Sequence, residues 1–391
     1  MQNKTSMRTF IFLNPSFFPN IGGAENSIFE MAKAAEANGD KAIIVCGTVN
    51  KIDDRLLPLE EMLSPAITVK RFESKRSYLA YWHCVKILRE SRQKKSNDVI
   101  VISRNHVMAL CARVAGFRMV NYMVPSVMYY QDKKTVRSAG IKSIGRYIGH
   151  ATTQCLAFCM SKTYAFSRTI ARQINRASLF VSKPRLLNPG INTDRFFSLS
   201  PEEIVVLRRQ LGIDVAATVL LGVGRFIELK QYHLAVEALA SLPENYVLVL
   251  VGAGPELDRY KSVATSKRVQ HRLKIFPATT DPVPYYQMSN LFMMTSRYET
   301  FGQVVLESVA TGLGVVAFRN GGAIDTAVED IFEGNGSLVA YADQVNARSL
   351  AKAIEMLAER CDSGIDESRQ ALLKKYSWMQ VLELISNNLK K

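Results

Sequence analysis

One stretch decides the fold of this chain: Glu299-Thr-Phe-Gly-Gln-Val-Val-Leu-Glu307. An apolar run before it, Leu291–Met294, predicts a buried strand, and residues 304–311 have the apolar spacing of a helix. A strand, a turn and a helix in succession are typical of open α/β sheets, which bind ligands at the carboxyl ends of their strands. Glu299 is predicted to lie in the turn, near the backbone N–H groups of Gly302 and Gln303. Two carboxylates beside a helix N-terminus suit a ligand with hydroxyls and phosphates.

Length and composition indicate a globular protein of two domains. The chain has 391 residues, 48% hydrophobic and 22% charged, and a single core seldom serves more than about 250–300 residues. No apolar run approaches the roughly 20 residues of a membrane span, and the N-terminal Met1-Gln-Asn-Lys-Thr-Ser-Met-Arg8 lacks the apolar core of a signal peptide. Six cysteines without C-x-x-C spacing predict buried thiols and a cytoplasmic location.

The net charge of +15 is concentrated in the first half of the chain. Residues 1–190 contain 29 basic and 12 acidic residues, a net of +17, whereas the remainder has 21 and 23, a net of −2. No acid lies between Asp132 and Asp194. This asymmetry predicts that the first half faces something anionic: a lipid headgroup surface, a nucleic acid or an acidic substrate.

Alternating strand and helix patterns predict two doubly wound domains. The first series has strands at 9–13, 41–46, 98–103 and 118–122, with helices after Gly22-Gly23 and at 78–91 and 107–115. Residues after about 123 are basic and less regular, apart from a helix capped by Ser167. The second series has strands at 218–222, 246–252, 272–276, 291–294 and 315–318. Pro189-Gly190 marks the boundary, so we predict domains at 1–190 and 191–375, followed by a helix at 376–391 that returns to the first domain.

Two glycine loops follow strands and could approach a phosphate. Gly22-Gly23 opens the first helix, although glycine in a tight turn is the commoner use. Gly222-Val-Gly224-Arg225-Phe-Ile-Glu-Leu-Lys230 offers a guanidinium fork and an ammonium five residues apart, which suit a diphosphate. Neither Gly222-x-Gly224 nor Gly252-x-Gly254 has the third glycine of a dinucleotide site, so an NAD enzyme is disfavoured.

Other catalytic and metal patterns are absent from the sequence. The five histidines form no H-x-x-x-H or H-E-x-x-H spacing, and neither G-x-S-x-G nor a Walker A sequence occurs. We therefore expect no metal site. His106, just past the predicted strand at 98–103, is the histidine best placed to face a cleft, although a lone histidine is more often structural.

Together these features resemble the retaining GT-B glycosyltransferases of glycosyltransferase family 4, also called group 1. The resemblance covers nearly the whole chain and depends on the E-x7-E element from Glu299 to Glu307, Gly224-Arg225 with Lys230, Gly252-Ala-Gly254-Pro255, Gly22-Gly23-Ala24-Glu25, Gly321-Gly322 and Tyr376-Ser-Trp378. It implies two Rossmann-like domains facing a central cleft, with the nucleotide sugar held mainly by the second.

The same resemblance implies a role for each candidate residue. Arg225 and Lys230 would bind the diphosphate, Glu307 the ribose hydroxyls and Glu299 the donor sugar. Backbone at Phe301, Gly302 and Gln303 would contact that sugar, and Gly22, Gly23, Gly224 and Gly254 would complete the donor site. On the same resemblance, the acceptor would attack from the leaving-group face, the leaving phosphate would take its proton, and no metal or other cofactor would be needed.

The chain departs from the family pattern at two places. Many members carry a histidine after the strand that matches residues 118–122, where this chain has Met123-Val-Pro-Ser-Val-Met128. His106 is left as a possible substitute for that catalytic histidine. The boundary motif has Asn188-Pro-Gly where Pro-Asn-Gly is usual, which concerns hinge geometry more than chemistry.

We therefore expect a cytoplasmic hexosyltransferase that uses a nucleoside-diphosphate sugar, UDP favoured, in the synthesis of a cell-surface polysaccharide such as lipopolysaccharide. Its acceptor would be a glycan or a lipid-linked glycan, and the basic residues 133–185 would dock on an anionic membrane. The alternatives are a GT-B epimerase or phosphorylase, a catalytically silent scaffold, and a basic nucleic-acid-binding protein. The last is disfavoured because no RNP, KH or helix-turn-helix pattern occurs, so no nucleic acid partner is expected.

Overall fold

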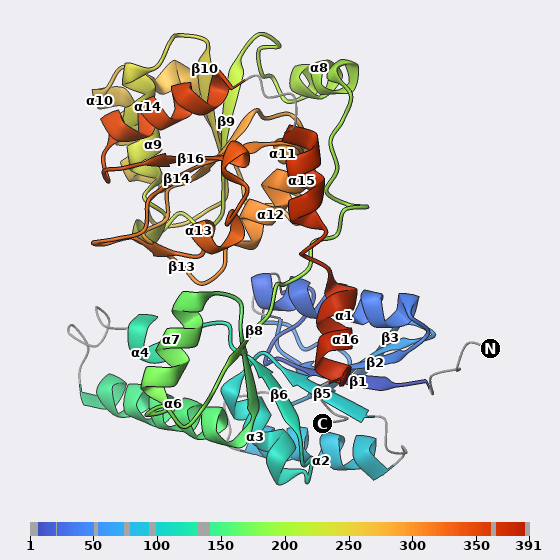
Figure 1. Cartoon of the computed structure of the whole chain (residues 1–391). Coiled ribbons are helices and arrows are strands. Elements are labelled where there is room, and N and C mark those ends of the chain that lie inside the picture. The colour runs from blue at the N-terminus through green and yellow to red at the C-terminus, as the bar shows by residue number, and fades with distance from the viewer. Residues whose placement is uncertain are drawn as a thin grey trace. The chain divides into compact units, whose positions relative to one another are not determined.

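A computed structural model describes residues 7–20, 22–50, 54–73, 79–93, 99–131, 141–360 and 365–387. The chain divides into two units, shown in Figure 1. Unit 1 consists of Met1–Gly190 and Ser377–Lys391, and unit 2 is Ile191–Tyr376. The first boundary falls at the same residue as in the sequence analysis, and the second lies one residue later. Gly190, where the chain leaves unit 1, lies against Trp378, where the chain has just returned to it. A Cβ on Gly190 would lie 2.2 Å from the backbone nitrogen of Trp378. Gly190 therefore permits close packing of two chain segments.

Unit 1 is built on a mixed sheet, with eight strands in its described part. Their order is β3-β4-β2-β1-β5-β6-β7-β8, and the pairs are parallel except for β3 with β4. β1 lies in the middle, so Thr9 is in register with Lys41 on one side and with Val99 on the other. The strands are β1 (Thr9–Leu13), β2 (Lys41–Gly47), β3 (Glu60–Ser64), β4 (Ile67–Phe72), β5 (Val99–Ser103), β6 (Val120–Met123), β7 (Lys162–Ala165) and β8 (Arg185–Leu186).

Helices cover both faces of this sheet, because alternate residues of a strand point to opposite sides. Phe10 and Phe12 of β1 pack in one core cluster with α1 and α16, whereas Ile11 and Leu13 pack in another with α2, α3, α6 and α7. Figure 1 shows α16, in red, beside α1. The helices are α1 (Gly23–Ala37), α2 (Leu79–Gln93), α3 (His106–Val114), α4 (Met128–Gln131), α6 (Ile141–Met160), α7 (Arg168–Ala177) and α16 (Trp378–Asn387).

Unit 2 contains a parallel sheet whose described strands follow the order β11-β10-β9-β12-β14-β16. When these strands are numbered by their sequence along the chain, the order becomes 3-2-1-4-5-6, which is that of a Rossmann domain. The direction of the numbering reverses between β9 and β12. A second sheet pairs two short strands in parallel. The strands are β9 (Thr218–Val223), β10 (Tyr246–Val251), β11 (Leu273–Phe276), β12 (Leu291–Met294), β14 (Gly314–Phe318) and β16 (Val339–Ala342), with β13 (Tyr298–Glu299) and β15 (Asp325–Thr326) in the small sheet.

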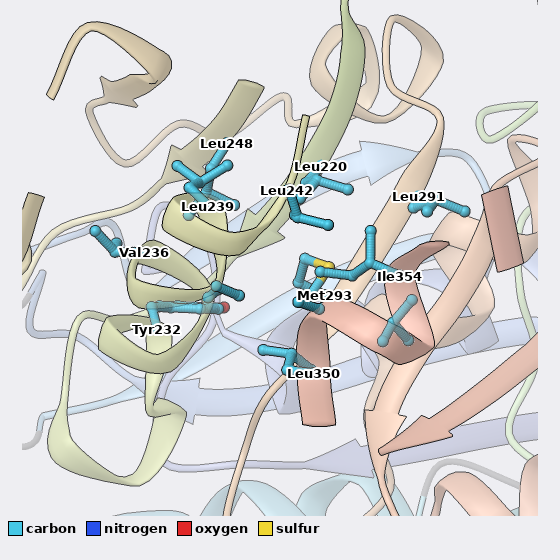
Figure 2. Close-up of a cluster of buried hydrophobic side chains, with 14 of the residues drawn as sticks. Leu220, Tyr232, Val236, Leu239, Leu242, Leu248, Leu291, Met293, Leu350 and Ile354 are labelled. Carbon is cyan, nitrogen blue, oxygen red and sulfur yellow. The ribbon is translucent and has the colours of Figure 1, made fainter. Parts of the chain in front are cut away.

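The core of unit 2 lies between this sheet and α9, α10 and α14. Figure 2 shows its side chains, with Leu220 and Met293 from the sheet, Tyr232 and Val236 from α9, and Leu350 and Ile354 from α14. The helices are α8 (Pro201–Gln210), α9 (Tyr232–Ala238), α10 (Leu257–Ser266), α11 (Val283–Gln287), α12 (Gln303–Ala310), α13 (Val328–Ile331), α14 (Ala347–Ala358) and α15 (Ile365–Leu373), with 3-10 turns η1 (Glu228–Lys230), η2 (Leu239–Ser241), η3 (Gln270–Arg272) and η4 (Gly336–Leu338).

Several expectations for unit 1 need correction. Residues 141–160, predicted to be irregular, form the long helix α6, and the antiparallel strand β3 was not predicted. The helical pattern of α6 is weak in the sequence because polar Gln154 is buried whereas Ile148 and Leu156 are exposed. Cys159 is also exposed, unlike the buried thiols expected. Cys361, Tyr78, Asp98, residues 133–140 of the basic segment and the last four residues lie outside the described residues.

Candidate functional site

The topological switch point of unit 2 brings two predicted loops together. β9 and β12 are neighbouring parallel strands, so the loop after β9, with Gly224 and Arg225, and the loop after β12 leave the same edge of the sheet. A hydrogen bond of 2.8 Å from the Arg297 backbone N–H to the Leu229 carbonyl joins the two loops. The Thr295 hydroxyl, which is buried, donates to the Lys230 carbonyl at 2.6 Å. These bonds fix the turn that ends in Lys230.

Lys230 and Glu299 form an ion pair at this point. Lys230 Nζ lies 2.6 Å from Glu299 Oε2, and the side chains are 16% and 22% exposed. Glu299 lies in the short strand β13 instead of the turn predicted for it, because β13 pairs with β15. This pairing holds the Glu299 backbone, so its carboxylate is positioned by a sheet and not by a loose loop.

Arg225 lies beside this pair on the loop after β9. Its side chain is exposed and has no hydrogen bond or ion pair within the described part of the chain. The neighbouring Gly224 is close to Lys230, since a Cβ on Gly224 would lie 3.5 Å from Lys230 Cε. The Lys230–Glu299 ion pair therefore lies close to Gly224, and the exposed Arg225 is the next residue along the chain.

A second loop supports the one that carries Arg225. The Phe226 N–H donates to the Ala253 carbonyl at 2.8 Å, and the Glu256 N–H donates to the Phe226 carbonyl at 3.0 Å. Gly252 has a φ of +157°, and a Cβ there would lie 2.0 Å from the Gly224 carbonyl oxygen. A Cβ on Gly254 would lie 2.4 Å from the Phe226 carbonyl oxygen. Gly252 and Gly254 therefore let two backbones pack together.

The start of α12 completes this region. Gly302 is the N-cap of α12 with a φ of +87°, and a Cβ on it would lie 3.4 Å from Glu299 Cγ. Gln303 is the first helical residue. Phe301 is buried, and its ring lies 6.0 Å from the Tyr376 ring, so this residue anchors the start of α12 in the core of unit 2.

Glu307 lies further along α12 and has a different partner from Glu299. Its Oε2 accepts a hydrogen bond of 2.8 Å from the Tyr286 hydroxyl. Burial raises the pKa of Glu307, whereas the Tyr286 hydrogen bond and the charge of Arg195 oppose that rise. Tyr286 was not predicted as a site residue. The only sequence signal for it was the aromatic pair Tyr285-Tyr286 just before the strand at 291–294.

The unit 1 candidates lie at the corresponding switch point, after β1 and β5. Gly22 is the N-cap of α1, and a Cβ on it would lie 2.6 Å from Glu25 Oε2. Gly23 is the first residue of that helix, with nothing within 4 Å of a Cβ on it. The Glu25 carboxylate accepts hydrogen bonds from the Asn14 amide and the Ser16 hydroxyl, so the first turn of α1 already contains a fixed anion.

His106 lies inward instead of at an open face. It is the first residue of α3, is buried, and packs with its ring centroid 5.7 Å from that of His150. Burial, with a smaller contribution from His150, lowers the pKa of His106 to about 4. His106 is therefore uncharged at neutral pH.

Arg104 was missed by the sequence reasoning. It follows β5, is only 7% exposed, and its guanidinium lies 4.7 Å from the centre of the Phe166 ring. Its Nε and Nη1 are buried without a hydrogen-bond partner. Burial lowers the pKa of Arg104 to about 10, so the side chain remains charged at neutral pH. The sequence shows only one more arginine in a basic half, and nothing in it indicates burial.

Within the described ranges, no three His, Cys, Asp or Glu side chains are grouped so that they could hold a metal ion.

Comparison with known proteins identifies the region that carries the unit 2 site. Residues 205–373 match the family model described as glycosyl transferases group 1. The chain carries a group 1 glycosyltransferase domain. This domain contains Arg225, Lys230, Glu299 and Glu307, whereas Gly22, Gly23 and His106 lie outside it.

Curated relatives of the group 1 domain are glycosyltransferases. The lipopolysaccharide core biosynthesis glycosyltransferase LpsE of Rhizobium meliloti is 34% identical over 154 residues, 39% of this chain and 43% of LpsE. A D-inositol 3-phosphate glycosyltransferase of Acidothermus cellulolyticus is 26% identical over 355 residues, 82% of this chain and 76% of that protein. The chain spans less than half the length of LpsE, and 47% of a Corynebacterium urealyticum D-inositol 3-phosphate glycosyltransferase.

Solved structures confirm the predicted fold class, an α/β fold with parallel sheets that matches GT-B glycosyltransferases. Anabaena Alr3699/HepE in complex with UDP and glucose has a TM-score of 0.72 at 18% identity, covering 98% of this chain and 99% of that one. WaaG, described as a glycosyltransferase involved in lipopolysaccharide biosynthesis, has a TM-score of 0.65 at 18% identity, covering 94% and 93%. At such low identity, these likenesses concern the fold alone.

Proposed function

We propose that this protein is a retaining glycosyltransferase that moves a hexosyl unit from a nucleoside-diphosphate sugar, UDP favoured, to a glycan or lipid-linked acceptor. The observation that carries the proposal is the Lys230–Glu299 ion pair beside the exposed Arg225, at the switch point of a Rossmann-ordered sheet. It is supported by the group 1 domain around these residues and by LpsE, which is named for lipopolysaccharide core synthesis.

Arg225 and Lys230 are the proposed diphosphate ligands. A guanidinium can bind two phosphate oxygens at once, and a positive charge there stabilises the diphosphate as it leaves. Lys230 donates one of its N–H bonds to Glu299, which leaves the other two for phosphate. Glu299 thus orients Lys230 and offers its second oxygen to a hydroxyl of the donor sugar.

Backbone and a second carboxylate supply the remaining donor contacts in this proposal. Glu307, fixed by Tyr286, accepts from the ribose hydroxyls. The backbone at 301–303, at the start of α12, is proposed to contact the sugar, and Gly22 and Gly23 are further proposed donor-binding residues, as the family resemblance implies.

The proposed reaction needs no side-chain base. The acceptor hydroxyl oxygen bonds to the anomeric carbon on the face from which the diphosphate leaves, the bond from that carbon to the phosphate oxygen breaks, and that oxygen takes the hydroxyl proton. A buried His106 with a pKa of about 4 agrees with this scheme, because nothing in it requires a charged imidazole. Metal independence and retention are parts of the proposal, as the family resemblance implies.

The acceptor is proposed to bind unit 1 at a membrane surface, in the synthesis of a cell-surface polysaccharide. The described residues contain no helix with the length and apolar character needed to cross a bilayer. We propose a peripheral location on the cytoplasmic leaflet, where the basic residues of unit 1 meet anionic lipid, with no nucleic acid partner.

The donor test is a thermal-shift screen with UDP-, GDP- and ADP-sugars, followed by a product assay. A UDP-sugar should raise the melting temperature most, and NMR of the product should show that the anomeric configuration of the donor is kept. Conversion of the nucleotide sugar without an acceptor would instead indicate an epimerase. An inverted product would refute retention.

Four variants test the site itself. Arg225→Ala and Glu307→Ala should weaken nucleotide binding by about 10- to 100-fold, as expected for charge-assisted hydrogen bonds. Glu299→Ala should mainly lower the transfer rate, by about 100-fold. Arg259→Ala, on the exposed face of α10 in the same unit, is the matched control and should bind donor normally. Near-wild-type nucleotide affinity in the first two variants would defeat the assignment.

A further inference from the structure

Three large apolar side chains in a row face solvent after α7. Leu179 is 82% exposed, Phe180 72% and Val181 66%. We call Leu179-Phe180-Val181 the apolar turn. Single exposed apolar residues are ordinary, but a contiguous group on a protruding turn marks an interaction site.

The backbone holds the apolar turn in this exposed conformation. Leu179 and Phe180 have φ values of +50° and +64°, a left-handed region that side chains other than glycine seldom adopt. The Phe180 N–H donates to the Asn175 carbonyl at 2.7 Å, and the Val181 N–H to the Ser178 carbonyl at 3.1 Å. The turn is therefore a fixed feature, and strained backbone of this kind occurs at functional sites.

A buried hydroxyl network fixes the end of the turn. The Ser182 hydroxyl shares a hydrogen bond of 2.6 Å with Thr163 of β7, and the Ser182 N–H donates to the Ser178 hydroxyl at 3.1 Å. The serines on either side of the apolar turn are both buried, while the three residues between them are exposed. The chain thus places polar groups inside and apolar groups outside, the reverse of an ordinary surface loop.

Exposed cations flank the apolar turn on both sides. Arg168, Arg172 and Arg176 lie at intervals of four residues on the exposed face of α7, whose other face buries Ile170 and Ile174. Lys183 and Arg185 follow the turn and are also exposed. No acidic residue occurs between Asp132 and Asp194, so no acid of this segment offsets these charges.

The adjacent helix α6 continues the apolar character. Ile144, Ile148, Leu156 and Met160 are all exposed and lie at intervals that are multiples of four. α6 is tied to the end of α7, since Cys155 Sγ lies 3.1 Å from the Ala177 carbonyl oxygen. The apolar turn thus follows the end of α7, and this end contacts α6, which carries further exposed apolar residues.

We propose that the apolar turn inserts into the boundary between headgroups and acyl chains of an anionic membrane, with the flanking arginines and lysines at the headgroups. Apolar side chains enter this boundary and gain burial, while cations beside them meet anionic lipid. The charge pattern favours lipid over a protein partner, because cations surround the apolar group on both sides. The proposal refines the membrane location of the proposed function, but the binding it describes needs no donor or acceptor.

A tryptophan reporter tests insertion directly. Phe180→Trp is made in the full chain with Trp82→Phe, because Trp82 is exposed, whereas the other tryptophan, Trp378, is buried. Vesicles of phosphatidylcholine with phosphatidylglycerol should shift the emission to the blue, and bromine-labelled acyl chains should quench it. Pure phosphatidylcholine should do so much less. Unchanged emission with anionic vesicles would overturn the proposal.

Vesicle co-sedimentation separates the apolar and electrostatic parts. Serine at all three positions of the apolar turn should reduce binding to anionic vesicles at least ~10-fold, and Arg172→Gln, Arg176→Gln or Lys183→Gln should each reduce it about fivefold. The control is Val206→Ser, an exposed apolar residue of α8 that should leave binding unchanged. Wild-type binding by the serine variant would refute the proposal.

Two measurements on the serine variant identify the reason for any loss. Its melting temperature and UDP affinity should match those of the wild type, because the replaced side chains are exposed. If UDP binds normally while neither protein binds vesicles, the membrane proposal fails and the proposed donor site stands. If the wild type self-associates without lipid and the serine variant does not, the turn is an interface between copies and the lipid proposal is wrong.

Discussion

The coupling between Lys230 and Glu299 can be measured apart from any ligand. The perturbation is a double-mutant cycle of Lys230→Met, Glu299→Gln and the double variant. The two charged atoms lie 2.6 Å apart, and the side chains are only 16% and 22% exposed. Exposed ion pairs contribute about 0.2–1 kcal/mol, whereas removing one partner of a buried pair costs about 3–5 kcal/mol. This pair is intermediate, so we expect each single variant to lose about 2 kcal/mol and the double variant about 2.5 kcal/mol.

These values correspond to a coupling free energy of about 1.5 kcal/mol. The assay is urea unfolding followed by circular dichroism, with the free energy of unfolding obtained by linear extrapolation. The control is the exposed pair Arg259–Glu256, 3.0 Å apart on one helical turn, which should show a coupling below about 0.5 kcal/mol. If Lys230 and Glu299 couple by no more than the control pair, the ion pair does not organise the site and the reasoning fails.

Three further predictions concern stability. The pKa of His106 is lowered from 6.5 to about 4, so protonation favours unfolding. The free energy of unfolding should therefore fall by up to about 3 kcal/mol as the pH is lowered from 6.5 to about 4. His106→Leu should remove this part of the pH dependence in urea unfolding, and equal slopes in both proteins would contradict it. Gly252→Ala should cost several kcal/mol (about 3 or more) because its Cβ would meet the Gly224 carbonyl oxygen. Gly334→Ala, at a φ of +80° with open space around it, should cost about 1 kcal/mol, and equal melting temperatures would refute the close approach. Arg104→Met should raise stability by about 1–2 kcal/mol, because a buried charge with two unpartnered nitrogen atoms is removed; a lower melting temperature would show that the Phe166 ring and the charge of Glu25 outweigh that cost.

The central strands of both sheets could be predicted because buried parallel strands are short apolar runs, whereas β4, β7, β8 and β16 were not predicted. β9 and β12 were recognised in this way, and the loops after them were identified as candidate ligand loops. The sequence could not show that these two strands are neighbours. Lys230 and Glu299 are 69 residues apart along the chain, and their contact depends on the strand order, which reverses between β9 and β12.

Burial was the property that the sequence predicted least well. His106 was considered the histidine best placed to face a cleft because it follows a strand, but the first turn of α3 packs it against His150 of α6. Since the helix α6 was not predicted as a whole, the contact with His150 could not be foreseen. No prediction was made for the apolar turn, because three apolar residues in a row do not show whether they are buried; only the structure shows Leu179, Phe180 and Val181 to be exposed.

Calorimetric titration with UDP tests the central claim, that the switch point of the group 1 domain binds a nucleoside diphosphate through Arg225. We expect UDP to bind the wild type at one site, Arg225→Ala to lower the affinity by about 10- to 100-fold, and Arg259→Ala not to lower it. Absence of binding by UDP, GDP and ADP alike, or equal UDP affinity in Arg225→Ala and the wild type, would contradict it.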